Sequence, residues 1–177
     1  MARYSAQRLA RTLRAGERAA STTERGRACE DLGLYLFEKF PGITLVARDE
    51  LDAFHAVETD LVFTNDIARS GLYFLEPVLI VECKNYASSS VSSQDVTYFA
   101  ARLSAKGARC GVLLTTTRVS GAQGVAGVHA LETALVQGVT ILVIDRGHLE
   151  SVSTTEQLLA TLMNQFVNYR VRGTLLA

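Results

Sequence analysis

Glu82, Cys83 and Lys84 place an acid and a base two residues apart at the end of an apolar segment. Residues 78–81 are apolar and mostly β-branched, which predicts a buried strand. Because side chains alternate across a strand, Glu82 and Lys84 fall on one face and Cys83 faces the core on the other. Such a pair is suited to acid–base chemistry, but an ion pair at a strand end explains the pattern equally well.

Asp60 and Glu30 are two further carboxylates set among apolar residues. Asp60 lies in the middle of residues 57–64, where alternating polar and apolar positions predict a strand. Glu30 lies on the inward side of an amphipathic helix predicted over residues 25–40. A carboxylate near a helix start also complements the helix dipole, so a structural and a functional role both fit Glu30.

The pairing of the two strands decides what these carboxylates can do. If residues 57–64 and 78–84 pair antiparallel with Asp60 and Glu82 on one face, the two carboxylates lie close together beside Glu30. Two like charges at about 4 Å repel by on the order of 4 kcal/mol at an effective dielectric near 20. A divalent cation turns this repulsion into attraction, so the pattern predicts a metal site with oxygen ligands.

The rest of the chain supplies the elements that hold these residues in place. Four apolar residues at helical spacing form a core stripe: Val96, Phe99, Ala100 and Leu103. Gln94 and Tyr98 lie one turn apart on a different face of that helix. Apolar segments at residues 110–115 and 139–144 predict two more strands, and residues 158–166 predict a final helix.

The first 27 residues are strongly basic. They contain seven arginines against Glu17 and Glu24, a net charge of 7 − 2 = +5, and since the whole chain is neutral the remainder carries −5. Residues 5–20 predict a helix with a thin apolar stripe and a basic remainder. The segment suits a polyanionic partner, although a solvated basic helix has the same charge pattern.

Length and composition indicate one globular domain. With 177 residues, 48% of them hydrophobic, we expect a basic helical arm over residues 1–22 and a single domain over residues 23–177. The three cysteines are widely spaced, which indicates neither a disulfide framework nor a zinc site. No apolar run approaches the roughly 18 residues of a membrane span, and the start lacks a secretory signal, so we expect a cytoplasmic protein with no membrane partner. An organellar transit peptide fits less well, because Glu17 interrupts the basic start.

The order of these motifs resembles the PD-(D/E)XK nuclease superfamily. A helix with Glu30, a strand with Asp60, and a strand ending in Glu82-Cys83-Lys84 are followed by a helix and a strand. The segment Val81-Glu82-Cys83-Lys84-Asn85-Tyr86 is most similar to the Mrr-like restriction endonucleases, and the resemblance extends over about residues 25–149. Thr59 stands where the superfamily's name motif has proline. The resemblance implies an α/β restriction-endonuclease-like fold with an αβββαβ core and a mixed central sheet flanked by helices.

The resemblance also implies a reaction, the Mg²⁺-dependent hydrolysis of DNA phosphodiester bonds in defence or DNA processing. Mg²⁺, with Mn²⁺ as a substitute, would be held by Asp60, Glu82 and the Cys83 carbonyl, and Glu30 would bind a second metal ion or a metal-bound water. Lys84 would orient the attacking water or help to deprotonate it. Gln94 and Tyr98, whose spacing is similar to a motif of RecB-like nucleases, would contact the scissile strand. The basic arm would contact phosphates through three arginines: Arg8, Arg11 and Arg14.

Two other functions fit the same pattern. A Holliday-junction-resolvase-like nuclease uses a similar core as a dimer on branched DNA, and a catalytically silent module of the same fold would bind nucleic acid or a partner protein. The sequence has no helix-turn-helix or zinc-finger signature. We therefore expect target recognition to come from the arm, from a homodimer, or from another protein.

Overall fold

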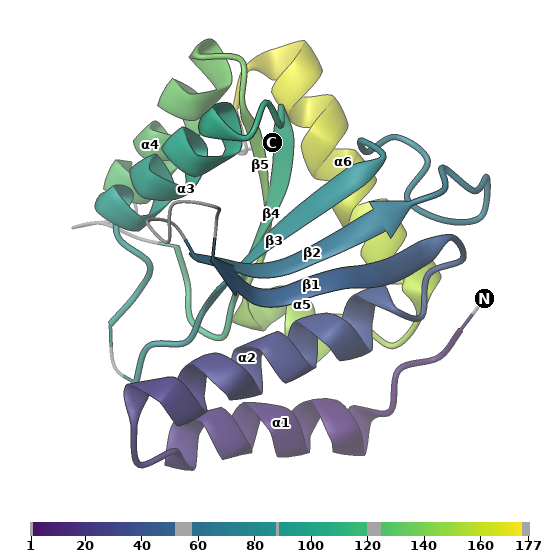
Figure 1. Ribbon diagram of the computed structural model, residues 1–177, viewed down its shortest axis with the longest axis vertical. Helices are drawn as coiled ribbons and strands as arrows, with labels where there is room; N and C mark the ends of the chain where they lie inside the picture. The colour runs from purple at the N-terminus through teal and green to yellow at the C-terminus, as the bar shows by residue number, and fades with distance from the viewer. Residues whose placement is uncertain (1, 52–57, 88, 120–124, 175–177) are drawn as a thin grey trace.

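The computed structural model describes residues 2–51, 58–87, 89–119 and 125–174 as one mixed sheet with helices on both faces (Figure 1). The sheet has five strands in the order β1-β2-β3-β4-β5, which is also their order along the chain. The elements from α2 to β4 follow the αβββαβ order that the sequence predicts. The α/β class and the mixed central sheet flanked by helices are therefore confirmed.

The sheet changes from antiparallel to parallel pairing at its central strand. The antiparallel part contains β1 (Ile43–Leu51) and β2 (Glu58–Asn65), and β2 in turn pairs antiparallel with β3 (Val78–Lys84). The parallel part joins β3 to β4 (Cys110–Thr115) and β4 to β5 (Thr140–Ile144). Every residue of β4 and β5 is buried, as expected for parallel strands covered on both faces. The predicted antiparallel pairing of the second and third strands is confirmed, and residue 57 of the predicted strand lies outside the described residues.

Two helical layers cover the sheet. On one face, α3 (Ser93–Ala105) and α4 (Val125–Val136) pack over Ile80, Leu113 and Val143. The other face carries four helices: α1 (Ala6–Arg18), α2 (Thr22–Phe37), α5 (Arg146–Ser151) and α6 (Thr155–Arg172). The helix predicted over residues 25–40 begins earlier, because the Ser21 side chain accepts the Glu24 amide as its N-cap. The final helix is also longer at both ends than predicted.

Helix α2 approaches the sheet closely at Gly33. A Cβ atom at this position would overlap the side chain of Leu61 on β2. Glycine therefore allows α2 to lie directly on the strand that carries Asp60, and this brings Glu30, one turn earlier on α2, near the same strand.

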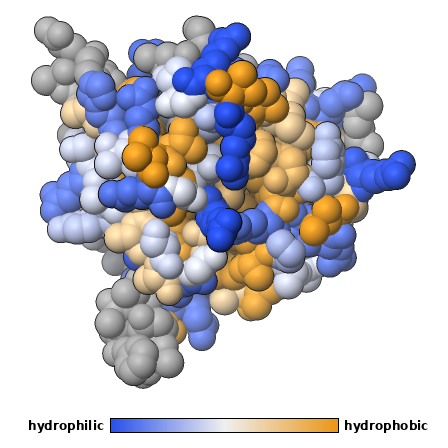
Figure 2. Space-filling view, turned by 90° about the horizontal axis from the view of Figure 1, so that it is seen from above, coloured by the Kyte–Doolittle hydropathy of each residue, from blue (hydrophilic) through white to orange (hydrophobic). Residues whose placement is uncertain are grey.

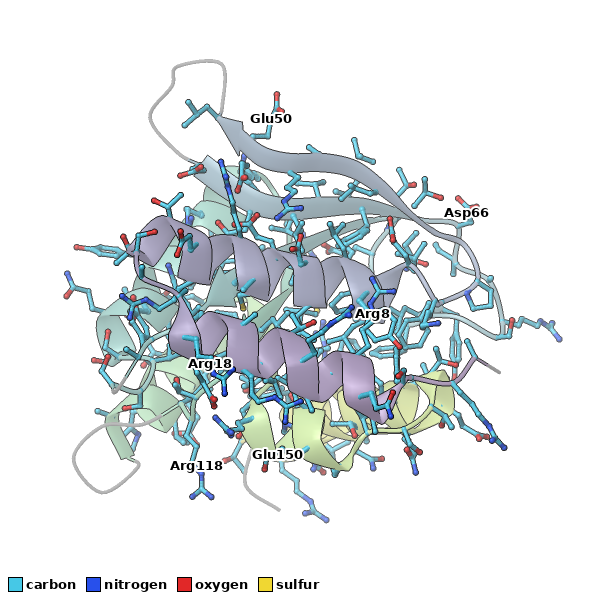
Figure 3. All side chains as sticks on the ribbon, turned by 90° about the horizontal axis from the view of Figure 1, so that it is seen from below. Arg8, Arg18, Glu50, Asp66, Arg118 and Glu150 are labelled. Carbon is cyan, nitrogen blue, oxygen red and sulfur yellow. The ribbon has the colours of Figure 1, made fainter. Side chains whose placement is uncertain are left out.

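Helix α1 belongs to the same packed structure. Its Leu9 and Leu13 are buried in the core that α2 shares, and α1 and α2 lie side by side in Figure 3. The segment before α1 is tied to the start of α6, because the Tyr4 amide donates to the Ser153 carbonyl at 2.9 Å. Glu17 also forms an ion pair at 2.6 Å with Arg146 of α5. The domain boundary at residue 22 stays a prediction from the sequence.

None of the described helices is both long and apolar enough to span a membrane. The face in Figure 2 has small groups of hydrophobic residues between hydrophilic ones. Scattered exposed apolar residues of this kind are ordinary on a protein surface.

Candidate active site

The ends of β2 and β3 meet through a side chain. Backbone pairing between these strands extends to Leu61 and Val81. Beyond this pair, the backbone N–H of Cys83 donates to Oδ2 of Asp60 at 2.6 Å. The Asp60 carboxylate thus accepts the amide that a neighbouring strand would otherwise bind, which fixes the start of β2 against the end of β3.

A pocket of about 560 Å³ opens where these strand ends face α2, and we call it the α2-side pocket. Four residues predicted for the site line it: Glu30, Asp60, Cys83 and Lys84. The rest of its lining comes from the first turns of α2 and from Asp49 and Glu58. Within the described residues, no three His, Cys, Asp or Glu side chains already converge as a metal-binding group.

Glu82 is 2% exposed and its carboxylate contacts two cations. Its Oε1 atom lies 2.8 Å from Nζ of Lys84 and also contacts the guanidinium of Arg102. The ion pair that the sequence left open is therefore present, and it neutralises a carboxylate that burial would otherwise destabilise. Both contacts are ion pairs without well-directed hydrogen bonds, since Oε1 of Glu82 has no hydrogen-bond partner among the described residues.

The carboxylates of Asp60 and Glu82 face different spaces. Asp60 lines the α2-side pocket, whereas Glu82 lines a small cavity under α3 together with Phe99 and Arg102. They are nevertheless close enough to interact, because the negative charge of Glu82 helps to raise the pKa of Asp60. The charges of Asp60 and Glu82 therefore act on each other, although the two side chains line different cavities.

Burial dominates the electrostatics of the site. The pKa of Asp60 is raised to about 7, first by burial and then by the charge of Glu82, while the Cys83 amide, Lys84 and Arg102 oppose the rise. Burial, the largest single effect, would lower the pKa of Lys84, but Glu82, Asp60 and Tyr86 together outweigh it and the pKa is raised. At neutral pH Lys84 is therefore a cation, while Asp60 is close to its midpoint of ionisation.

Glu30 is buried as predicted and is held by a residue that the sequence did not reveal. Nε of Arg48 on β1 lies 2.7 Å from Oε2 of Glu30, and its Nη1 lies 2.8 Å from Asp31. Burial raises the pKa of Glu30 and Arg48 opposes the rise, while neighbouring Asp49 adds to it. Asp49 has a φ of 51°, in the left-handed region that aspartate tolerates better than most residues.

The turn after Lys84 is anchored by Asn85. The Asn85 amide donates to the Arg25 carbonyl of α2 at 2.9 Å, and its Oδ1 accepts the Thr116 hydroxyl at 2.6 Å. Gly16 of α1 also packs against Asn85, because a Cβ atom at this position would overlap the Asn85 amide. Three separate elements thus fix the chain next to the lysine.

A second groove adjoins the pocket on the other side of Lys84. This α3-side groove, of about 550 Å³, is lined by Lys84, Tyr98 and Arg102, and Lys84 and Glu58 line both spaces. The predicted neighbours Gln94 and Tyr98 are in contact, since Nε2 of Gln94 donates to the Tyr98 hydroxyl at 2.7 Å. Both side chains are exposed, and Tyr98 lines the groove.

The three arginines predicted to contact phosphates lie apart from this cluster. Arg8, Arg11 and Arg14 are exposed on α1, outside its buried stripe of Leu9 and Leu13. The Arg8 guanidinium stacks on the Tyr35 ring, 4.0 Å from its centroid. Figure 3 shows Arg8 and Arg18 near opposite ends of α1.

A family model described as restriction endonuclease, the Mrr catalytic type, matches residues 56–148. This match covers more than half of the 177 residues. The chain belongs to this restriction endonuclease family. The part matched contains Asp60, Glu82, Lys84 and Gln94, and it begins after Glu30. No curated protein matches the chain.

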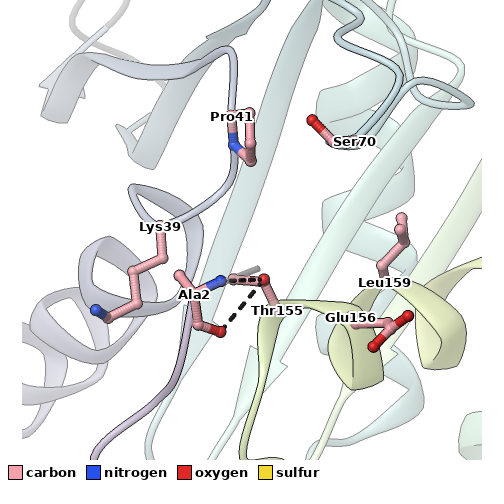
Figure 4. Close-up of a pocket in the computed structure, with 7 residues that line it drawn as sticks. All are labelled: Ala2, Lys39, Pro41, Ser70, Thr155, Glu156 and Leu159. Carbon is pink, nitrogen blue, oxygen red and sulfur yellow. Dashed lines mark hydrogen bonds between the residues drawn. The ribbon is translucent and has the colours of Figure 1, made fainter.

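This restriction-endonuclease-like nuclease has another pocket, away from its predicted site residues. That pocket, of about 500 Å³, lies between the N-terminal segment, the end of α2 and the start of α6 (Figure 4). It is closed at one end by Ala2, whose amide donates to the Thr155 hydroxyl at 3.1 Å. None of the predicted site residues lines it.

Proposed function

We propose that this nuclease is a divalent-metal-dependent endonuclease that hydrolyses phosphodiester bonds of DNA. The observation that carries the proposal is the α2-side pocket, which brings Glu30, Asp60, Cys83 and Lys84 together at the end of β3. Asp60, Glu82 and Lys84 lie within the part of the chain that matches the restriction endonuclease family. Membership of the family supports a nuclease in general, and the arrangement of these residues supports the metal-dependent reaction.

The side chains at the site fit a hard divalent cation. Mg²⁺ prefers oxygen ligands and is usually bound through one or two carboxylates, with water completing its shell. Glu82 offers a buried oxygen without a hydrogen-bond partner among the described residues, and Asp60 has a pKa raised to about 7, first by burial and then by Glu82. We propose that Asp60, Glu82 and the Cys83 carbonyl hold Mg²⁺ or Mn²⁺, with Glu30 as a further ligand or a holder of bound water. When bound, the cation would stabilise charge on the phosphate and lower the pKa of a bound water.

Lys84 acts in this proposal through its positive charge. Its pKa is raised, because Glu82, Asp60 and Tyr86 together outweigh the effect of burial, so the ammonium keeps its proton at neutral pH. A protonated amine cannot take a proton from water, so orientation and charge neutralisation are its roles rather than deprotonation. It lines both the α2-side pocket and the α3-side groove, from which it can reach a phosphate bound in either space.

DNA contacts are proposed on both sides of the site. Tyr98 lines the α3-side groove, where its exposed ring suits stacking on a base, and Gln94 would contact the scissile strand beside it. Arg8, Arg11 and Arg14 would contact phosphates, which positions a duplex without reading its sequence. A homodimer or a partner protein would then supply target recognition, in restriction, defence or DNA processing. A cytoplasmic location also stays a prediction.

The test uses purified protein with Mg²⁺ or Mn²⁺ on linear, branched and single-stranded DNA. The wild type should cleave, EDTA should abolish cleavage, and Glu82→Ala and Lys84→Met should each reduce the rate by at least about 100-fold. Lys39→Met is the matched control, because Lys39 lies at the separate pocket of Figure 4 and should leave the rate unchanged.

Each result has a definite meaning. A wild type that cleaves no substrate, or a Lys84→Met variant as active as the wild type, would overturn the proposal. Binding of DNA without cleavage would leave the catalytically silent module. Cleavage of branched DNA alone would favour the Holliday-junction-resolvase-like enzyme.

A further inference from the structure

Arg102, on α3, forms an ion pair with the carboxylate of Glu82. Its guanidinium contacts Oε1 of Glu82, the same oxygen that Nζ of Lys84 approaches to 2.8 Å. Glu82 is 2% exposed, so this oxygen has little access to water. One carboxylate oxygen is thus shared between two cations.

Arg102 is itself held firmly in this position. Its Nη1 donates to the Glu58 carbonyl of β2 at 2.9 Å, and its guanidinium lies 5.9 Å from the centroid of the Phe99 ring. Its side chain is 24% exposed and lines both the cavity under α3 and the α3-side groove. The arginine therefore links α3 to the adjoining ends of β2 and β3.

These contacts separate the two carboxylates that the proposed metal site requires. Asp60 faces the α2-side pocket. Glu82 is not among the described residues that line this pocket. Glu82 instead faces the cavity that Arg102 helps to line. For both carboxylates to bind one cation, the Glu82 side chain has to turn away from Arg102 toward Asp60.

The charges of the cluster lead to the same conclusion. Asp60 and Glu82 contribute two negative charges when ionised, and Lys84 and Arg102 contribute two positive charges, so the cluster has no net charge. A neutral cluster attracts a divalent cation weakly. Without Arg102 its net charge would be −1, and charges about 5 Å apart interact strongly at the effective dielectric of a partly buried site.

From this geometry we infer that Arg102 is a positioning residue that withdraws Glu82 from the α2-side pocket and thereby weakens divalent-cation binding at the nuclease site. The inference rests on the proposed function, because it takes Asp60 and Glu82 as the ligands. The inference adds that Arg102 on α3, which is not itself a ligand, helps to set the affinity of Asp60 and Glu82 for the cation. A phosphate of bound DNA in the α3-side groove would offer Arg102 another anionic partner and release Glu82.

The test measures binding of Mn²⁺ without DNA, by electron paramagnetic resonance or calorimetry. Arg102→Gln and Arg102→Met remove the charge, and each should tighten Mn²⁺ binding at least about tenfold, which corresponds to about 1.4 kcal/mol. Arg102→Lys keeps the charge and should stay within about threefold of the wild type. Adding Asp60→Asn to Arg102→Gln should abolish the gain, which assigns it to this site. Two neutral variants keep the test valid if one of them does not fold.

The outcomes separate this inference from the proposed function. If the wild type binds Mn²⁺ and both neutral variants bind it equally or more weakly, Arg102 does not withdraw Glu82 and the inference is overturned while the nuclease proposal stands. A purely structural role for Arg102 would give this weaker binding. If neither the wild type nor any variant binds Mn²⁺, the proposed metal site itself is overturned, and the inference with it.

Discussion

Replacing Asp60 by asparagine should stabilise the protein at alkaline pH. Burial first, and the charge of Glu82 second, raise the pKa of Asp60 from the ordinary value of 3.8 to about 7. A carboxyl group whose pKa is higher in the folded than in the unfolded state contributes stability that is fully present below the unfolded pKa and is lost as the pH rises through the folded pKa. At pH 8 the ionised carboxylate therefore opposes folding.

The size of the effect follows from the two pKa values. The difference between 3.8 and about 7, at 1.36 kcal/mol per pKa unit, gives about 4 kcal/mol as an upper bound at pH 8. Asparagine removes the charge and keeps an oxygen that can accept the Cys83 N–H, which Asp60 now binds at 2.6 Å. Because Glu82 and the two nearby cations also adjust, we expect Asp60→Asn to gain about 2 to 4 kcal/mol at pH 8 and less than half of that at pH 5.

Urea unfolding in the presence of EDTA measures this gain at both pH values. EDTA ensures that no divalent cation stabilises the wild type and hides the effect. Asp66→Asn is the control, since Asp66 is an exposed carboxylate in the connection between β2 and β3. A gain of equal size at pH 5 and pH 8, or a loss of stability at pH 8, would refute the argument that burial and Glu82 destabilise the Asp60 carboxylate.

Three further predictions concern the elements around the site. Leu13→Ala should lower the free energy of unfolding in urea by about 2 to 5 kcal/mol because its side chain is buried between α1 and α2, and a change no larger than that of Thr12→Ala would contradict this packing. Gly16→Ala should lower the free energy of unfolding by about 1 to 3 kcal/mol, because the added methyl group overlaps Asn85. In an Asn85→Ala background this loss should vanish, and an equal loss in both backgrounds would show that the two residues are not coupled. Arg48→Met should destabilise the protein by about 2 kcal/mol or more at pH 8, because it leaves the buried Glu30 carboxylate without its cation. The loss should be smaller at pH 5, since the raised pKa of Glu30 favours its protonated form there. Calorimetric unfolding at both pH values checks this, and a pH-independent loss counts against it.

Periodicity was sufficient to predict the arrangement of the central strands. The apolar run before Glu82 and the alternation around Asp60 predicted two strands, and their antiparallel pairing is confirmed. Core strands are predictable in this way because burial on one or both faces determines which side chains can occupy them. The inward position of Glu30 on α2 followed from the same reasoning with the helical period.

The partners of the carboxylates were not predictable from these periods. Arg48 and Arg102 reach Glu30 and Glu82 from elements far away in the sequence, through long side chains whose directions depend on the complete packing. Periodicity placed Glu82 and Lys84 on one face, but it could not show that the Glu82 carboxylate turns under α3. The positive φ of Asp49 is likewise a backbone property that no side-chain pattern encodes. The only signal for Arg102 was its place one turn after Tyr98 on the same helix.

The strap formed by Ala2 and Tyr4 has a consequence for the order in which the protein folds. Ala2 binds Thr155 across 153 positions of the sequence, and Tyr4 binds the adjacent Ser153. At about 5 to 20 residues per second, a ribosome needs roughly 8 to 30 s to synthesise the intervening chain. For that time Ala2 and the Tyr4 amide lack these partners, although the Tyr4 hydroxyl can already donate to the Leu36 carbonyl and α1 can pack on α2. These two contacts therefore form only after the chain has reached Ser153 and Thr155, and an interrupted chain that ends before residue 153 cannot complete either of them.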